Sequence, residues 1–429
     1  MNKSFHKTFK FLDWYFDEPK HQLQLNYHVE EIGKVTECLE FPEFSISEEK
    51  NQAIEYACEL IHLMCGVSYY KAGLAENIIF ENKVPNRELA VFFEKTWRNG
   101  LAELTFENEV VDLKGVSTLS SKSLLEERVL TPFSSLKSLV PLGGGKDSLV
   151  TIEELKQQGK DITLFMVGQS ELIQDVAQFI DLPLIQVQRK IDPQLIAYNK
   201  TNKGFNGHVP ITAINSSIAV LTALLFDFSE IVFSNERSAD SANTINAQGE
   251  SVNHQYSKSQ EFESDLAKII TQQISPSLKY YSQQRSFSEL AILEKFSHYP
   301  QYFPIFSSCN RNFHIDGSKN VNSRWCCDCP KCRFVFLGLA PFVEKKQLLE
   351  IFKYNMLNDE KQEQGFAELL GTEGFKPFEC VGEIAESQLA FNLIKGKSQW
   401  SKDYLIQYFS NKCPRVSSEQ QRHIMQATP

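Results

Sequence analysis

The chain has 429 residues and a mass of 49.1 kDa, which is long enough for two or three compact domains. Hydrophobic residues make up 42% of it and charged residues 23%, which excludes global disorder. The net charge of -10 excludes the broad basic face that duplex nucleic acid binding needs. The N-terminus lacks the apolar core of a signal peptide, and the longest mostly apolar stretch, Ile218 to Phe226, is too short to span a membrane. We therefore expect a soluble cytoplasmic protein with no nucleic acid or membrane partner.

The first 125 residues or so are predicted to form an α+β unit of their own. Apolar and polar residues alternate at 9 to 16 and again at 23 to 29, as in strands with one buried face. The turn sequence Asp17-Glu-Pro-Lys between them predicts an antiparallel hairpin. From Glu48 the apolar spacing becomes helical, and Gly66 is the predicted end of that helix.

Beyond a polar segment at 117–127, the signals alternate between strand and helix. We predict strands at 136–142, 162–167, 184–187 and 231–233, and helices at 146–158, 172–179 and 211–226. The strands are nearly all apolar, which is typical of a parallel sheet covered by helices on both faces. The predicted fold class is therefore α/β with a parallel, doubly wound sheet. Its predicted units are an N-terminal α+β domain (1–125), a central parallel-sheet domain (130–341) and a C-terminal helical cap (342–429).

A glycine-rich loop, Pro141-Leu-Gly-Gly-Gly-Lys-Asp-Ser148, joins the first of these strands to its helix. Three successive glycines allow a close approach to an anion, and the helix that follows offers free N–H groups. Its lysine adds a positive charge, its serine a hydroxyl, and Asp147 a carboxylate that can hold Mg2+ bridging phosphates. The alternative is a plain glycine turn with a capping side chain. The predicted phosphate-binding residues are Gly143, Gly144, Gly145, Lys146, Asp147 and Ser148.

This loop resembles the SGGxDS motif of the ATP-pyrophosphatase (PP-loop) superfamily, with Gly143 in place of the usual first serine. Enzymes of that superfamily split ATP between the α and β phosphates and transfer AMP to a carboxylate or carbonyl oxygen. The resemblance implies ATP as a co-substrate and Mg2+ as its partner. The segment from His208 to Asn215 is similar to one in relatives that make 7-cyano-7-deazaguanine, which implies that Asn215 faces the nucleotide. A capping or solvated side chain is the alternative for Asn215.

Three polar segments follow 231–233, which is the last strand that the pattern predicts. They are Ser234 to Asp240, Val252 to Lys258 and Glu261 to Glu263, and none shows a helical apolar stripe. Ligands of open α/β sheets bind beyond the carboxyl ends of the strands, so these segments are expected to form part of a site. A long loop without structure of its own is otherwise solvated or disordered.

Five phrases together resemble the UDP-N-acetyl-α-D-muramoyl-L-alanyl-L-glutamate epimerase family, and they extend over most of the chain. They are GVSYYKA at 66–72, SNERSA at 234–239, VNHQYSKS at 252–259, RWCCDCPKCRFVFLGLAPF at 324–342 and KPFECVGE at 376–383. The resemblance implies ATP-dependent inversion of the terminal L-Glu of a UDP-linked muramoyl dipeptide, a cytoplasmic cell-wall precursor. AMP and pyrophosphate would be the other products.

Inversion at an α carbon needs proton-transfer groups on both faces, or one mobile base. The catalytic candidates are His254, Lys258, Glu236 and Asp240, with Cys327 as a thiolate alternative. The substrate-binding candidates are Tyr69, Lys71, Asn235, Arg237 and Tyr256. For each of them a structural hydrogen bond or salt bridge is the alternative role. Because the net charge is -10, an anionic UDP-linked substrate must be held by local cations such as Lys71, Lys146, Arg237 and Lys258.

The ten cysteines are unevenly placed along the chain. Cys326, Cys329 and Cys332 recur at three-residue spacing, and Cys309 can supply a fourth thiolate for a tetrahedral Zn2+ site. Redox-active thiols, simple buried cysteines and an iron-sulfur cluster are the alternatives. The scattered cysteines are expected to be small buried hydrophobic residues: Cys38, Cys58, Cys65, Cys380 and Cys413.

Two other functions compete with epimerisation. A PP-loop ligase or sulfur transferase of the 7-cyano-7-deazaguanine synthase type would use the same kind of adenylate, but it would need ammonia or a sulfur donor. A catalytically silent nucleotide-binding protein with a structural zinc is the third interpretation. No pattern in the sequence sets the oligomeric state.

Overall fold

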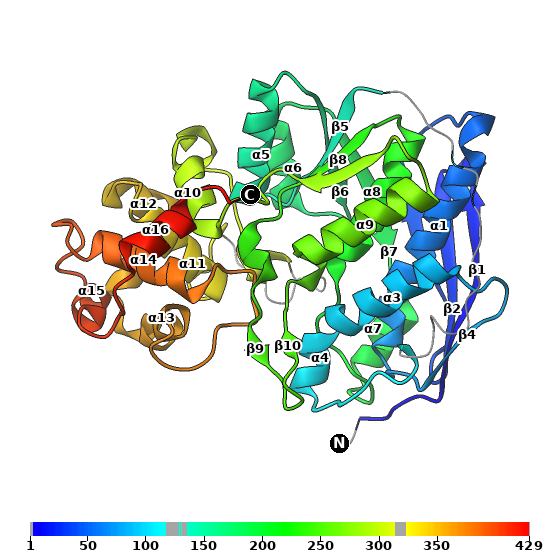
Figure 1. The fold of residues 1–429 in the computed structure, drawn as a ribbon, viewed down its shortest axis with the longest axis horizontal. Helices are drawn as coiled ribbons and strands as arrows, with labels where there is room; N and C mark the ends of the chain where they lie inside the picture. Colours follow the sequence, from blue (N-terminus) through cyan, green and yellow to red (C-terminus); the bar gives the residue numbers. More distant parts are fainter. Residues whose placement is uncertain (1–2, 117–127, 129, 131–134, 314–322, 429) are drawn as a thin grey trace.

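The computed structural model describes residues 3–116, 128, 130, 135–313 and 323–428. A nine-stranded sheet crosses it in the order β11-β8-β5-β6-β7-β3-β2-β1-β4 (Figure 1). The strands are β1 (Thr8–Asp17), β2 (Gln22–Val29), β3 (Gly33–Glu40), β4 (Asn77–Phe80), β5 (Lys137–Pro141), β6 (Asp161–Val167), β7 (Leu184–Lys190), β8 (Glu230–Phe233) and β11 (Lys279–Ser282). The five strands from β11 to β7 are parallel, and the pairs from β7 to β1 are antiparallel. The central sheet is therefore mostly parallel, as predicted.

The predicted helices between these strands are present. They are α1 (Asn51–Cys65), which ends at Gly66 as expected, α5 (Lys146–Gln157), α6 (Glu171–Ile180) and α8 (Ile211–Leu225). The predicted hairpin is β1 paired with β2. The helices that the pattern did not indicate include α2 (Val67–Tyr70), α3 (Arg87–Gly100), α4 (Ala102–Glu107) and α7 (Pro193–Asn199). The polar segment at 117–127 lies outside the described residues.

The parallel strands send alternate side chains into two separate cores. Leu139, Phe165 and Ile231 pack with α1, α3, α8 and α9 (Gln260–Gln273). Their neighbours Val140, Leu164 and Val232 pack with α5, α6, α10 (Glu289–Ser297) and α11 (Pro330–Leu339). This is why the strands are apolar on both faces, and it confirms the predicted covering of the sheet by helices on both sides.

The N-terminal strands extend the parallel part of the sheet. β3 pairs antiparallel with β7, and Arg189 on β7 donates from Nε to Oε1 of the buried Glu37 on β3 at 2.7 Å. Residues of α1 and α8 also share one hydrophobic core. The first 116 residues are thus joined to the parallel-stranded part by one sheet and one core, and the predicted boundaries at 125 and 341 stay a prediction.

The strand at 231–233 is not the last of the sheet, which corrects our expectation. β11 lies beside β8, and α9 begins inside the segment that we expected to be a polar loop. Ser259 caps this helix, because its Oγ accepts a hydrogen bond from the Phe262 N–H at 3.2 Å. The helix buries Phe262, Leu266, Ile269 and Ile270. The apolar stripe of this helix was missed because its first turn contains two glutamates and only one apolar residue, Phe262.

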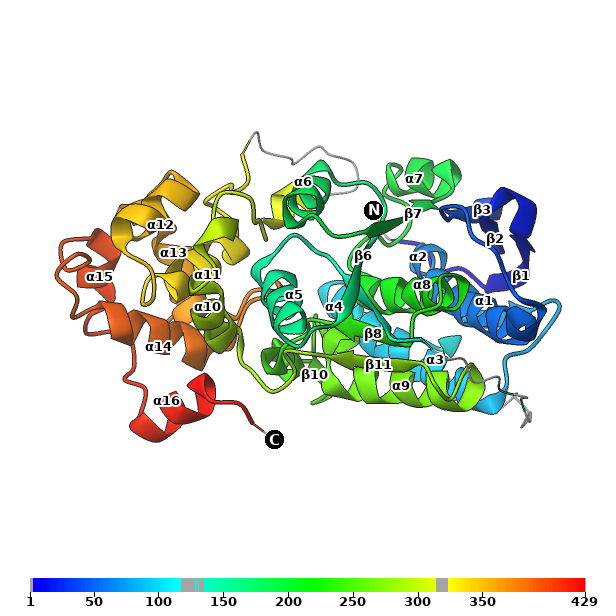
Figure 2. The same cartoon turned by 90° about the horizontal axis from the view of Figure 1, so that it is seen from above.

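The C-terminal region is helical, as predicted, and it gathers at one end of the molecule beside α5 and α10 (Figure 2). Its helices are α12 (Lys345–Phe352), α13 (Glu363–Leu370), α14 (Ile384–Ile394), α15 (Tyr404–Phe409) and α16 (Ser418–Met425). Among the described residues, no helix combines the length and the apolar character that crossing a bilayer requires.

Candidate active site

A cavity of about 380 Å³ opens where β5, β6 and β8 end. In the sheet, β6 and β7 lie on one side of β5, whereas the later strand β8 lies on the other side of β5. The strand order therefore reverses at β5. Crevices at such reversals are where open α/β sheets bind ligands. The polar side chains that line it include Asp147, Asn215, Asn235, Glu236, Lys258 and Lys331.

The glycine-rich loop forms one wall of this cavity. Gly144 has φ +74°, a conformation that favours glycine, and its carbonyl accepts a hydrogen bond from the Ser307 N–H at 3.0 Å. Gly145 precedes α5, and a Cβ added there would lie 2.7 Å from Oγ of Ser308. Backbone shape thus favours glycine at 144, and a side chain at 145 would force Ser308 to move. The loop brings the N-terminus of the 12-residue α5 to the cavity, where its free N–H groups favour an anion.

Three carboxylates meet behind this loop. One oxygen each from Asp147, Glu236 and Glu289 lies within 4.8 Å of the others. Lys146, which is 3% exposed, donates to Asp147 at 2.5 Å and forms a second ion pair with Glu289. Burial opposes the charge of Lys146, but the two carboxylates outweigh it and raise its pKa. Burial raises the pKa of Glu289, and the positive charge of Lys146 opposes this rise. Lys146 therefore bridges Asp147 and Glu289, two of the three carboxylates.

Replacing Glu289 by Gln is expected to lower the free energy of unfolding by about 3 kcal/mol, because a buried ion pair loses one partner. Urea unfolding at pH 7 measures the change. The matched control is Glu76→Gln, which breaks a 3.3 Å pair with Lys114 whose side chains are 51% and 69% exposed. We expect less than about 1 kcal/mol for this control. Equal effects of the two substitutions would contradict the structural role of the Lys146 and Glu289 pair.

Four polar atoms around the cavity are buried without a hydrogen-bond partner among the described residues. They are Oδ1 of Asn215, Oγ of Ser234, Nδ2 of Asn235 and Oε1 of Glu236. Unpaired buried polar groups are rare and costly, and here all four belong to residues that line one cavity. A polar ligand in the cavity would satisfy them.

A second polar cluster contains Glu103, His208 and His254. Their side chains bring ligand atoms within 4.8 Å of one another, and Nδ1 of His254 is hydrogen-bonded to Oε2 of Glu103. Burial lowers the pKa of His208 to about 3, with His254 and nearby lysines adding to the effect. Burial also lowers the pKa of Lys71 to about 8, and Lys71 donates to the carbonyl of Gly207 at 3.2 Å. Lys71 thus stands beside this cluster.

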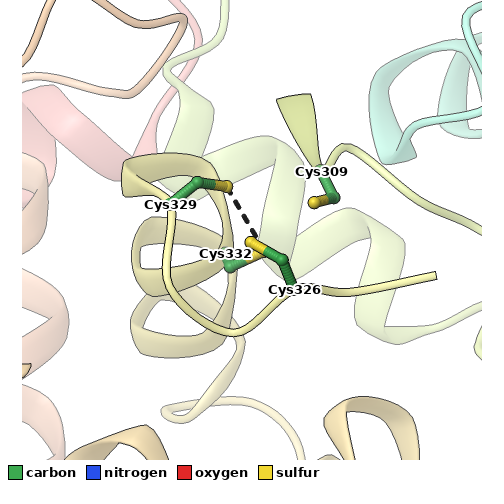
Figure 3. A group of neighbouring side chains, drawn as sticks. All are labelled: Cys309, Cys326, Cys329 and Cys332. Atoms are coloured by element: carbon green, nitrogen blue, oxygen red, sulfur yellow. Dashed lines mark hydrogen bonds between the residues drawn. The ribbon is translucent and has the colours of Figure 1, made fainter. Parts of the chain in front are cut away.

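The four clustered cysteines lie side by side, and Figure 3 shows their sulfurs turned toward a common centre. The Sγ atom of Cys332 is 3.7 Å from that of Cys326 and 3.4 Å from that of Cys329. Bonds of about 2.3 Å to a tetrahedral Zn2+ would separate two sulfurs by about 3.8 Å, so the set fits zinc. Cys327 lies outside the set. Its thiol donates to the Phe352 carbonyl at 3.2 Å, and burial raises its pKa to about 12, so it does not join the other base candidates.

Residues 1–283 match the family model of the MurL N-terminal domain, and residues 305–424 match that of the MurL C-terminal domain. The chain belongs to the MurL family. Curated relatives carry the name UDP-N-acetyl-alpha-D-muramoyl-L-alanyl-L-glutamate epimerase. One from Xanthomonas oryzae pv. oryzae is 38% identical over 406 residues, which cover 94% of this chain and 89% of the relative. Another from Salinispora tropica is 36% identical over 379 residues, which cover 88% and 82%. The resemblance drawn from the five phrases is confirmed.

The structure brings together only part of the site that the MurL resemblance implied. Glu236, Lys258, Asn235 and the glycine-rich loop share the cavity with Asn215, and His254 lies in the second cluster. The others lie elsewhere. Asp240 is exposed and its carboxylate accepts from a backbone N–H at the start of α9. Arg237 donates to groups at 423–428.

The two tyrosine candidates are packing residues in this MurL family member. Tyr69 is fully buried, and its hydroxyl accepts a hydrogen bond from the Asp192 N–H at 3.1 Å. Tyr256 is also buried, beside the ring of Phe262. Neither lines the cavity.

Four residues near the site were missed by sequence reasoning: Glu103, Glu289, Lys331 and Cys380. Lys331 and Cys380 lie inside two of the MurL-like phrases, which was the available signal. Glu103 and Glu289 belong to no recognisable motif, and only the folded chain brings them to the site. The scattered cysteines also need a correction. Cys58, Cys65 and Cys413 are buried, but Cys38 and Cys380 are partly exposed, and Cys380 lies among charged side chains.

Proposed function

We propose that the chain uses ATP to invert the terminal L-Glu of UDP-N-acetylmuramoyl-L-Ala-L-Glu to D-Glu, in the cytoplasmic synthesis of peptidoglycan precursors. The reaction would pass through an acyl-adenylate and release AMP and pyrophosphate. The names of the MurL relatives support the substrate and the inversion. The observation that carries the adenylation is the cavity at the strand reversal, which has a glycine-rich loop on one wall and three carboxylates behind it.

ATP would bind with its phosphates on the glycine-rich loop, as in the PP-loop superfamily. The N–H groups at the start of α5 suit an anion, and Asn215 and Asn235 offer unpaired polar atoms to the rest of the nucleotide. Asp147, Glu236 and Glu289 supply the oxygen ligands that Mg2+ prefers, so they would hold the ion. When bound, Mg2+ would neutralise the phosphate charge.

Adenylation makes the α-proton of the glutamyl residue removable. Beside an ionised carboxylate, the carbanion would stand next to a full negative charge. Once AMP is attached, that charge is cancelled and the carbonyl oxygen can accept the electron pair as an enolate. Lys258 and Lys331 line the cavity and bring positive charge to the region where this oxygen would lie. Together with Lys71 they also suit an anionic UDP-linked substrate.

We propose a structural Zn2+ ion on the four clustered cysteines. Cys309 lies two residues after Ser307, whose N–H is hydrogen-bonded to the Gly144 carbonyl in the glycine-rich loop. Cys332 directly follows Lys331, which lines the cavity. Zinc would therefore tie two walls of the cavity together. A closed set of four thiolates leaves no open position for substrate, which is typical of a structural ion.

The proposal is tested by incubating the protein with the UDP-linked dipeptide, ATP and Mg2+ in the absence of ammonia and of any sulfur donor. We expect AMP and pyrophosphate to form while the mass of the dipeptide substrate stays unchanged. A requirement for a donor, together with a product of altered mass, would instead identify a ligase or a sulfur transferase. Absence of AMP with this substrate would favour a silent nucleotide-binding protein.

A further inference from the structure

The loop that carries Cys380 is packed against the segment that carries His254. Cys380 lies between α13 and α14, and Asn243 joins the two segments. The Nδ2 atom of Asn243 donates to the carbonyl of Pro377 at 2.8 Å, and its Oδ1 accepts from the His254 N–H at 3.1 Å. The thiol and the imidazole are thus held together by the folded chain although they are far apart in sequence.

Glu103, His254 and Cys380 form a chain of interacting side chains. His254 uses Nδ1 to bond the buried Glu103, which leaves Nε2 as the ring nitrogen that can exchange a proton with another group. The Cys380 thiol interacts with this imidazole. The ring of His208 lies 4.2 Å from that of His254 and packs against it. A carboxylate that orients an imidazole beside a thiol is an arrangement that activates the sulfur.

The surrounding charges favour the ionised form of the thiol. Burial alone would raise the pKa of Cys380, but Lys258, Lys331 and His254 outweigh it and lower this pKa to about 5. Burial lowers the pKa of His254, whereas Cys380 and Glu103 together raise it to about 9. Between these pH values the pair is a thiolate beside an imidazolium. The titratable groups that face the pair are Lys258, Lys331, Glu103, Glu107, Glu379 and His208.

The segment packed against the Cys380 loop reaches the nucleotide cavity. Lys258 lies four residues after His254 and lines that cavity, so the segment that carries His254 borders it. Lys331 lines the cavity as well, and the charges of both lysines favour the Cys380 thiolate. Two buried atoms on the Cys380 loop, Nζ of Lys376 and Oε2 of Glu379, have no hydrogen-bond partner among the described residues. Lys376 is only 9% exposed. Unpaired charged groups of this kind point to a polar ligand beside the thiol.

We propose that the Cys380 thiolate is one of the two proton-transfer groups, acting on one face of the glutamyl α carbon, with His254 as its positioning residue. This inference rests on the proposed epimerisation. The Cα–H bond breaks, its proton forms an S–H bond on Cys380, and its electron pair moves to the adenylated carbonyl as an enolate. A general acid on the opposite face then supplies a new proton to Cα. The His254 imidazolium then releases its Nε2 proton to solvent and takes the proton from the sulfur, which restores the thiolate beside an imidazolium.

Replacing Cys380 by Ala separates the two halves of the reaction. The variant is expected to keep ATP–pyrophosphate isotope exchange with the UDP-linked dipeptide, because the thiol lies outside the glycine-rich loop and the three carboxylates. In D2O, deuterium incorporation at the glutamyl α carbon should fall by at least about 100-fold, since a proton-transfer group is lost. Cys38→Ala removes another partly exposed thiol, on β3, and should retain both exchange reactions.

The two exchange reactions distinguish failure of this inference from failure of the proposed function. Deuterium incorporation by Cys380→Ala at the normal rate would overturn the role of Cys380 alone. Loss of both exchanges in this variant with normal unfolding would also overturn it, because the thiol would then act before proton transfer. Absence of pyrophosphate exchange in the unaltered protein would overturn the proposed function and this inference together.

Two further variants keep the test valid if Cys380→Ala folds poorly. Cys380→Ser has nearly the same size and a hydroxyl of much higher pKa, so deuterium incorporation is again expected to be lost. His254→Gln removes the imidazolium beside the sulfur, and the acidic limb of the pH profile for deuterium incorporation should move to higher pH. A fully active serine variant, or an acidic limb that His254→Gln leaves in place, would contradict the assignment.

Discussion

Replacing Asp147 by Asn is expected to lower substrate-dependent pyrophosphate release by at least about 100-fold, a size typical of losing one electrostatic contact to a developing charge. The carboxylate of Asp147 lines the cavity and stands with Glu236 and Glu289, where Mg2+ would bind. Asn keeps the shape and the oxygen that accepts from Lys146, but it removes the charge that attracts the ion.

The experiment compares initial rates of pyrophosphate release at saturating ATP and increasing Mg2+. The matched control is Asp175→Asn on α6, an aspartate that is 56% exposed and pairs with Arg324 at 2.9 Å. The control should retain normal rates, and both variants should unfold at a similar urea concentration. An Asp147→Asn variant with a normal rate and normal Mg2+ dependence would exclude the role that we give to this carboxylate.

Replacing Cys332 by Ser is expected to abolish zinc binding and to destabilise the region around α11. The wild-type chain should contain about one equivalent of Zn2+, and the variant should contain almost none. Because binding free energy at a structural ion contributes to folding, we expect a loss of stability on the order of 5 kcal/mol. Metal analysis and urea unfolding measure the two effects.

The control for this substitution is Cys413→Ser, which alters a buried thiol in the C-terminal helical region. Its zinc content should be unchanged. A chelator should destabilise the wild-type protein and the Cys413→Ser variant, but it should leave Cys332→Ser unaffected. Wild-type protein that is purified without zinc and is insensitive to chelators would contradict a structural ion at this site.

Local patterns predicted the parts of the fold and site that depend on neighbouring residues. The glycine-rich loop was found because a strand, three glycines and a helix follow one another directly. Cys326, Cys329 and Cys332 were found for the same reason, since their spacing fits one turn and the start of a helix. The β1–β2 hairpin was indicated by its alternation and its turn.

The parts that were missed depend on packing between distant segments. Glu289 begins α10 and Glu103 lies on α4, and neither position carries a pattern that reveals its partners. Cys380 looked like any isolated cysteine, because its significance comes from His254 and Lys258 on another segment. The pairing of β3 with β7 is also invisible in the sequence, since register between distant strands is set by the whole core.

The chirality of the terminal glutamate tests the central claim most directly. UDP-N-acetylmuramoyl-L-Ala-L-Glu is incubated with the protein, ATP and Mg2+, the product is hydrolysed, and the released glutamate is resolved on a chiral column. We predict D-Glu, formed together with AMP and pyrophosphate and absent when ATP is omitted. Recovery of L-Glu alone, under conditions where binding of ATP is demonstrated, would contradict the account.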